Sequence, residues 1–463
     1  MRAFWLKLRD LTSAIHLVPR VIAHARGSSR GSVAFRGIFT GGGGRVVATI
    51  TSLVSFPLLI NYLGQEGFGI YITISSVVGW LQMGNLGFGL ALLNLLAEAV
   101  GQNDTSAQRK LVVTTQFSLF FICSVMLLGW CGIFLFNLIS WPSFFNAQAS
   151  VYSTQIQAAT FWAGAIVIVT ILNGYVQSIY GANQWGDRFG LWYIASQLAG
   201  FCGMLLAVVF KLGLVGLILG VTGLPALVIF ACGIGLMFKY PDQYLPRPSG
   251  FSPGVLRSVI KYGSAFFFTQ IAATMQYSLD NFIISRTIGP AAVTPYAIAM
   301  KPFNLYLTFN GVAITPYWAA FGHAKGSSDW AWVRKNIGRL RILTLGSYAV
   351  FFLFMMVAGQ TVIRLWVGAQ AVPSMVLLGL VGIYVFVRVW TDLYSIVCNG
   401  LNIIVKTAIL NIPQGILSAT CMYFFTSVWG VNGLVLGSTA SMLMLAAWVG
   451  PYLVRKEIEK HVA

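Results

Sequence analysis

Charged residues inside long apolar runs are the strongest chemical signal in this chain. Asp280 and Lys301 lie in the apolar stretch 256–322, and Arg388 and Asp392 lie four positions apart in a later one. A charge at bilayer depth costs about 3 kcal/mol or more, so such side chains face a bundle interior or a water-filled cavity. The expected substrate-binding cavity charges are Arg45, Asp280, Lys301, Arg388, Asp392 and Lys406.

This set of charges favours recognition of an anion. The four cations exceed the two carboxylates by two. Arg grips phosphate oxygens through paired N–H donors, and Lys supplies a compact positive charge. Arg388 and Asp392 share a helix face and can pair, as can Asp280 and Lys301 on neighbouring spans. If every charge pairs with another, the cluster is structural and roughly neutral. If the two surplus cations stay unpaired, they indicate an anionic ligand. The expected polar residues of the cavity are Asn85, Gln276 and Asn281.

Patterns for covalent or metal chemistry are not visible. The six cysteines fall inside apolar runs without CxxC spacing, and the four histidines lie in the two tails and one loop. Such cysteines read as small buried hydrophobes. We therefore expect no enzyme activity, no catalytic residues, no metal site and no cofactor. A coupling ion, proton or sodium, is left open.

The chain that carries these charges has the composition of a multi-pass membrane protein. The chain has 463 residues, of which 57% are hydrophobic and 9% charged, against about a quarter charged in soluble domains. One crossing takes about 20 apolar residues. This predicts an all-α polytopic protein with about twelve transmembrane helices, near 33–62, 67–99, 112–138, 157–181, 189–210, 214–238, 256–287, 291–321, 338–358, 373–399, 403–426 and 431–453.

The sequence also indicates an internal duplication. Leu63-Gly64 matches Ile288-Gly289, and Arg109-Lys110 matches Arg334-Lys335, each at an offset of 225 positions (289 − 64 and 335 − 110). Two copies of a six-helix unit keep the same orientation, with a pseudo-axis along the membrane normal. We predict two pseudo-symmetric bundles, 33–238 and 256–453, around a central cleft. They are joined by a cytoplasmic linker at 239–255 and flanked by cytoplasmic tails at 1–32 and 454–463.

Two features of the first 62 residues allow more than one interpretation each. The tail 1–32 has apolar and basic stripes at helical spacing, which suits a helix on an anionic membrane surface. An unstructured tail has the same composition, and an organelle-targeting peptide is also Arg-rich and poor in acidic residues. Four consecutive glycines, Gly41–Gly44, precede Arg45. They predict a bend at the inner mouth of the cavity or, alternatively, a cytosolic linker before the first span.

The distribution of basic residues sets the expected orientation. The net charge is +18, and Lys and Arg concentrate in the loops that share a side with the basic tail. Cytoplasmic loops carry this excess. Both termini are therefore expected to be cytoplasmic. Nucleic-acid binding is not expected, because no soluble basic domain is visible.

Two motifs resemble a known family. One runs Leu256-Arg257, Tyr262-Gly263, Asp280 and Ile288-Gly289; the other runs from Pro57 to Tyr71 and continues with Asn85-Leu86-Gly87-Phe88-Gly89. Over about residues 33 to 455 the chain resembles the polysaccharide and lipid-linked oligosaccharide (O-antigen-like) flippases of the multidrug/oligosaccharidyl-lipid/polysaccharide exporter superfamily. It has Asn85 where many of these proteins have Asp, so a titrating role is not expected there.

The resemblance implies a transporter without covalent chemistry, located in the plasma (inner) membrane of a bacterium. It would flip a polyprenyl-(pyro)phosphate-linked oligosaccharide from the cytoplasmic to the outer leaflet for surface polysaccharide synthesis, by alternating access. The implied partners are that substrate, membrane lipid, a polysaccharide polymerase and glycosyltransferases. Two alternatives remain: an ion-coupled drug or metabolite antiporter of the same superfamily, which would need a titratable acid pair in the first bundle, and a non-transporting scaffold of a polysaccharide-synthesis complex.

Overall fold

The computed structural model describes residues 29–401 and 403–462, and every regular element within them is a helix. The all-α fold class is therefore confirmed. Residues 1–28 of the predicted tail lie outside the described residues. The α-helices are α3 (Ser29–Gly79), α4 (Phe88–Gly101), α5 (Thr105–Leu135), α6 (Trp141–Phe144), α7 (Ser153–Leu172), α8 (Gly174–Ala182), α9 (Gly186–Val209), α10 (Gly213–Ile218), α11 (Leu224–Lys239), α12 (Pro241–Tyr244), α13 (Pro253–Tyr277), α14 (Asp280–Thr287), α15 (Val293–Gly326), α16 (Trp330–Val367), α17 (Met375–Gly400), α18 (Ile404–Ser441) and α19 (Ala447–Val462).

Two long helices contain sharp kinks that separate successive crossings. α3 breaks at Gly64 (φ 69°), and α18 breaks at Gly430 (φ 59°). Glycine fits both kinks, because a side chain at positive φ clashes with its own backbone. The helices α6 and α12 have four residues each and are too short to cross a membrane. With these two set aside, dividing α3 and α18 at the kinks and joining α4, α8, α11, α14 and α19 to the helices before them groups the described helices into twelve crossings. Length and hydropathy alone identify eight candidate spans.

The outward faces of these helices are apolar. On α16, Val350, Val357 and Leu365 expose 72%, 81% and 84% of their surface, and Leu128 on α5 exposes 74%. A soluble monomer rarely exposes apolar surface on this scale. Together with the candidate spans, these faces indicate contact with lipid, so the chain is a multi-pass membrane protein.

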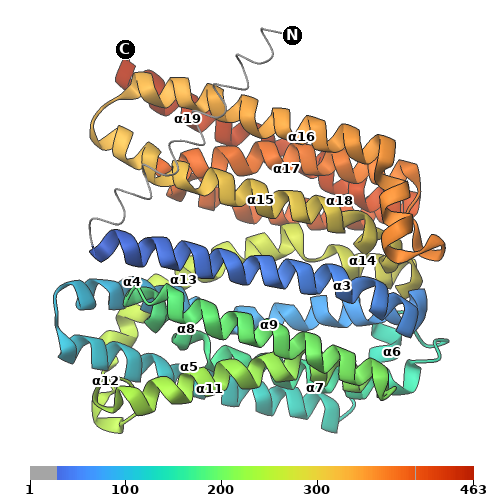
Figure 1. Ribbon diagram of the computed structural model, residues 1–463, viewed down its shortest axis with the longest axis horizontal. Helices are drawn as coiled ribbons and strands as arrows, with labels where there is room; N and C mark the ends of the chain where they lie inside the picture. Colours follow the sequence, from blue (N-terminus) through green and yellow to red (C-terminus); the bar gives the residue numbers. More distant parts are fainter. Residues whose placement is uncertain (1–28, 402, 463) are drawn as a thin grey trace.

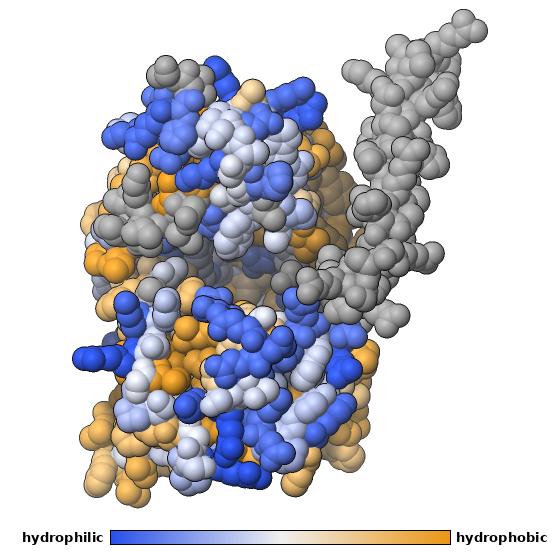
Figure 2. All heavy atoms as spheres, turned by 90° about the vertical axis from the view of Figure 1, so that its left-hand side faces the viewer, coloured by the Kyte–Doolittle hydropathy of each residue, from blue (hydrophilic) through white to orange (hydrophobic). Residues whose placement is uncertain are grey.

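Helices from the two halves of the sequence occupy different parts of the molecule. Figure 1 shows the helices from α4 to α11 below α3, and those from α15 to α19 above it. α3 packs against α9 and also contacts α14 and α15, while α13 packs against α18 and also contacts α4 and α5. Figure 2, seen from the end that carries the C-terminus, shows a recessed band between the lower and upper parts. Contacts between the halves therefore run through α3 and through α13, and also between α14 and the α6 region, where the Ser285 hydroxyl donates to the Phe145 carbonyl.

The proline-rich segment between the halves is tightly packed rather than loose. It contains α12 and a 3₁₀ turn, Pro248–Gly250, and Tyr244 is 1% exposed. Gln116 of α5 donates to the Tyr244 carbonyl at 3.0 Å, and the Ser252 N–H donates to the Thr114 hydroxyl at 3.1 Å. The segment expected to link the halves is thus fastened to α5.

The glycine run near the start of the first crossing is helical. α3 continues through Gly41–Gly44, and its non-helical backbone is at Gly64. The predicted bend is therefore wrong. The alternative, a cytosolic linker before a first span that starts at Val46, stays a prediction, and the candidate span of this helix begins at Val46. A Cβ added at Gly44 would lie 2.8 Å from Cδ1 of Tyr193 on α9. Close approach of α3 to α9 explains this glycine, and tertiary packing outweighs its low helix propensity.

Candidate functional site

Lys301 of α15 is held against α3. Its Nζ donates a hydrogen bond to the Ser52 hydroxyl and lies 4.3 Å from the centroid of the Phe56 ring. A hydroxyl acceptor and a cation–π contact offset part of the cost of removing an ammonium from water. No ion pair of Lys301 is found in the described part of the chain. The half-buried ammonium therefore keeps its capacity to bind an anion.

A small cavity continues from this contact into the first half. It has a volume of about 340 Å³, lies among α3, α9 and the π-helical turn Leu219–Gly223, and includes Ser52 and Phe56 in its wall. The described residues of its lining include no Asp or Glu. Hydroxyl and amide groups supply its other polar surface, from Thr51, Ser55, Tyr71, Ser75 and Gln197. Such groups can hydrogen-bond sugar hydroxyls or phosphate oxygens.

Asp280 does not pair with Lys301, contrary to the expectation from their similar depths. At the start of α14, one carboxylate oxygen of Asp280 accepts from the Tyr296 hydroxyl at 2.7 Å, and the other accepts from the Asn281 N–H at 2.9 Å. The Asn281 side chain donates to Ser76 of α3 at 3.0 Å, and its own carbonyl oxygen is buried without a hydrogen-bond partner. The helix break Ser278–Leu279 points Asp280 at Tyr296 of α15, while Lys301 points at α3.

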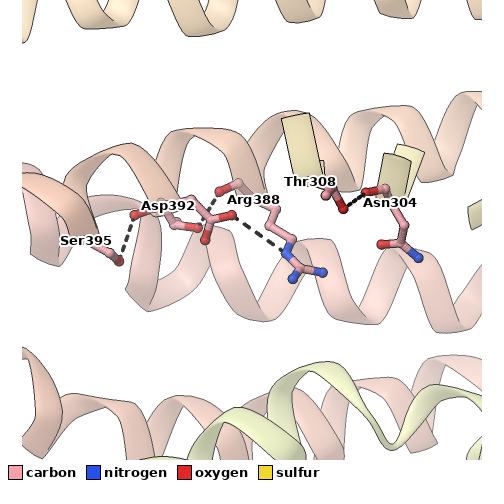
Figure 3. A network of polar contacts seen from close by, with 6 residues as sticks. Asn304, Thr308, Arg388, Asp392 and Ser395 are labelled. Atoms are coloured by element: carbon pink, nitrogen blue, oxygen red, sulfur yellow. Dashed lines mark hydrogen bonds and ion pairs between the residues drawn. The ribbon is translucent and has the colours of Figure 1, made fainter. Parts of the chain in front are cut away.

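Arg388 and Asp392 form the ion pair that their spacing predicts. Arg388 Nε lies 3.9 Å from Asp392 Oδ2, and the guanidinium carbon lies 4.3 Å from the centroid of the Tyr277 ring. The separation is too long for a hydrogen bond, so Arg388 Nε is buried without one. Figure 3 shows the guanidinium directed away from Ser395 and towards the part of α15 that carries Asn304. Arg388 is therefore only partly neutralised.

The remaining expected site residues are not part of the Lys301 or Arg388 contacts. Arg45 and Lys406 lie on α3 and α18, but their side chains are outside the described part of the structure. Asn85 accepts the Gly87 N–H at 2.7 Å, which shapes the turn between the 3₁₀ helix Trp80–Asn85 and α4. The Asn85 side chain therefore stabilises this turn of the backbone. Gln276 is half-buried near the end of α13.

The charges therefore form two groups rather than one. Lys301 faces the first half, whereas Arg388, Asp392 and Tyr277 lie together within the second. That Lys301 and Arg388 face one shared cavity stays a prediction. Sequence reasoning missed Ser52 and Phe56, the partners of Lys301. The available signal was the cluster of hydroxyl residues on span one, which sits at helical spacing with Phe56.

The sequence matches one family model and several curated relatives. The model described as "Polysaccharide biosynthesis protein" matches residues 34–321. The chain is 22% identical over 426 residues to a Salmonella typhimurium protein provisionally named an O-antigen transporter, covering 89% of this chain and 94% of the relative. It is also 22% identical over 435 residues to a Yersinia pseudotuberculosis protein provisionally named an O-antigen export protein, covering 91% and 95%.

The structure is similar to solved transporters of the MOP superfamily. An inward-facing multidrug resistance MATE family transporter superposes with a TM-score of 0.75 at 15% identity, covering 89% of this chain and 95% of the other. An outward-facing conformation of such a transporter gives 0.62 at 15% identity, covering 94% and 97%. A MOP superfamily transporter from Pyrococcus furiosus gives 0.64 at 15% identity, covering 95% and 98%. At these identities the likeness establishes the fold alone.

Proposed function

The chain belongs to the polysaccharide biosynthesis protein family, and from this membership we propose that it flips a polyprenyl-(pyro)phosphate-linked oligosaccharide from the cytoplasmic to the outer leaflet of the bacterial plasma membrane. It is a membrane transport protein and not an enzyme. The names of its relatives, O-antigen transporter and export protein, support a surface glycan as cargo.

The observation that carries the proposal is the half-buried ammonium of Lys301. It has a hydroxyl and a ring as partners, and it sits beside a cavity lined by hydroxyl groups. A cation at this depth is stabilised far more by an anion than by a neutral hydroxyl. The (pyro)phosphate of the substrate would replace Ser52 as the partner of Lys301. Arg388, whose Nε has no hydrogen bond, is the second proposed contact.

Alternating access requires that the halves separate at one end and close at the other. At the end of the molecule near the Gly64 kink, the Thr294 hydroxyl donates to the Gln65 carbonyl at 2.6 Å, and a Cβ on Gly69 would lie 1.9 Å from the Pro290 carbonyl oxygen. The opposite end is recessed between the halves (Figure 2). We assign the end near Gly64 as the closed outer end and the recessed end as the open cytoplasmic end.

The antiporter alternative is less well supported by the first-half cavity. Ion coupling through carboxylates needs Asp or Glu where the ion binds, and the lining of this cavity has neither. Asn85, at the position where an acid was considered, is bonded to the backbone instead. In the proposed pathway, glycosyltransferases build the substrate at the cytoplasmic face before flipping, and a polysaccharide polymerase consumes it afterwards.

Export of the surface glycan tests the proposal. Lys301→Ala should lower export tenfold or more at normal protein abundance, because the phosphate loses its cation. Lys301→Arg should keep part of the activity, since the charge remains although its geometry changes. Ser52→Ala is the matched control: it removes the resting partner of Lys301 and should retain export. Normal export by an abundant Lys301→Ala variant would exclude the role of Lys301.

A further inference from the structure

A second cavity lies outside the region of Lys301 and Arg388. It has a volume of about 860 Å³ and lies between the first turns of α16 and the length of α19, with Tyr394 of α17 in its wall. This end of the molecule also carries the α15–α16 loop and the C-terminus (Figure 1). The residues used below are Arg334, Arg341, Tyr394, Trp448, Tyr452 and Arg455.

The cavity carries excess positive charge. Three arginines line it, from α16 and α19, against one carboxylate, Glu459. Arg455 and Glu459 already pair at 2.6 Å within α19. Arg334 and Arg341 have no ion pair in the part of the chain that the structure describes. Two guanidinium groups are therefore available for an anion.

One of these arginines is held in place by aromatic groups. Arg341 donates to the Tyr394 hydroxyl, and its guanidinium carbon lies 5.4 Å and 5.7 Å from the ring centroids of Tyr394 and Trp390. Arg341 has five N–H donors, so further donors remain after this bond. A positioned guanidinium loses less conformational entropy when it grips two oxygens.

The rim of the cavity has the composition of a membrane–water interface. Trp448 and Tyr452 expose 68% and 62% of their surface, and Lys456 Nζ lies 5.8 Å from the centroid of the Tyr452 ring. Exposed Trp and Tyr mark the depth of the lipid headgroups. Apolar residues complete the wall, including Ile337, Pro451 and Ile458. A ligand here would have both a charged and an apolar part.

We propose that this cavity binds the headgroup of an anionic phospholipid, with the phosphate between Arg334 and Arg341 and the acyl chains along the apolar wall. Basic cavities between transmembrane helices on the cytoplasmic side suit such headgroups. A free phosphate shares the charge but has nothing to place on the apolar wall or the aromatic rim. The bound lipid joins α16 to α19, and its site is separate from the transport pathway.

Native mass spectrometry of the purified full-length protein tests this site. The probes are phosphatidylglycerol, phosphatidylcholine with the same acyl chains, and inorganic phosphate. The wild-type protein should retain phosphatidylglycerol in preference to phosphatidylcholine, and equimolar inorganic phosphate should not displace it. Displacement by inorganic phosphate, or equal retention of the two lipids, would overturn the proposal. This comparison needs no variant.

Paired variants locate the binding. The double variant Arg334→Gln with Arg341→Gln removes the two charges proposed to hold the phosphate and should bind phosphatidylglycerol about tenfold more weakly or worse. The control, Lys335→Gln with Arg339→Gln, removes two charges from the same helix at exposed positions that do not line the cavity. It should bind as the wild type does. An unchanged affinity in the cavity variant, or an equal loss in the control, contradicts the assignment.

Discussion

Lys301 of α15 donates a hydrogen bond to Ser52 of α3, although the two residues are 249 positions apart in the sequence. This contact connects the second half of the chain to the first at the edge of a hydroxyl-lined cavity. A relative movement of the halves would break it and release the ammonium. In the state described here, this hydrogen bond holds the two halves together. In our proposal, the substrate phosphate replaces Ser52 as the partner of Lys301.

The outer contact between the halves can be locked chemically. Gln65→Cys with Thr294→Cys, in a chain whose six native cysteines are replaced, places one thiol on each of two residues that are joined by the hydrogen bond from the Thr294 hydroxyl to the Gln65 backbone carbonyl. A short thiol cross-linker should reduce glycan export to near background, and a reductant should restore it, because the outer end can no longer open.

The control for this lock stays within one half. The hydroxyl oxygens of Ser140, at the start of α6, and Ser143, within α6, are 3.1 Å apart, so a cross-link between cysteines at these positions should leave export unchanged. Full export by a completely cross-linked Gln65–Thr294 cysteine pair would argue against alternating access through this end.

Asp280 depends on Tyr296 for one of its two hydrogen bonds. Tyr296→Phe removes the donor and leaves a partly buried carboxylate oxygen unpaired, which should lower the free energy of unfolding by about 1–3 kcal/mol. Thermal unfolding of the purified protein in detergent measures this. Tyr423→Phe, at an outward-facing tyrosine that is 60% exposed, should leave the melting temperature unchanged; equal melting temperatures for both variants would refute the role of Tyr296.

The pair Arg388–Asp392 separates a binding role from simple neutralisation. Arg388→Gln should lower glycan export tenfold or more, because the proposed second cation is lost. The double variant Arg388→Gln with Asp392→Asn removes both charges, so no unpaired charge remains to destabilise the fold. We expect it to be as abundant as the wild type and still inactive. An active double variant would show that the pair is only structural.

The predicted topology can be read from two exposed positions. Ala149 lies between α6 and α7, next to the buried Ser150, and Ser328 lies between α15 and α16. With the native cysteines replaced, Ala149→Cys should react with an impermeant maleimide on intact cells, and Ser328→Cys should react only after permeabilisation. The reverse pattern would invert the orientation assigned from Lys and Arg.

The sequence was sufficient for features that depend on local spacing. The Arg388–Asp392 pair follows from positions four apart on one helix, and the helical fold class follows from long apolar runs. The partners of Lys301 depend instead on how α15 is rotated against α3, which composition does not determine. Asp280 shows the same limit: the helix break before it directs the carboxylate to Tyr296 rather than to Lys301.

Glycine and asparagine positions show why local rules were overridden. Gly41–Gly44 suggested a bend from their low helix propensity, yet close packing of Gly44 on Tyr193 holds them in α3. Asn85 was considered for a cavity role, but its side chain caps a turn of its own backbone. In both cases the deciding contact depends on how the backbone is placed in the fold, which the residue type alone does not predict.

Flipping by the purified protein tests the central claim most directly. The protein is reconstituted in liposomes with a fluorescent polyprenyl-pyrophosphate-linked oligosaccharide, and an impermeant quencher reports the label that reaches the outer surface. Wild-type protein should flip the lipid well above protein-free liposomes, and Lys301→Ala should fall tenfold or more towards that background. Lys211→Ala, which removes an exposed lysine after α9, should flip as the wild type does. Equal rates for the wild-type and Lys301→Ala proteins would contradict the account.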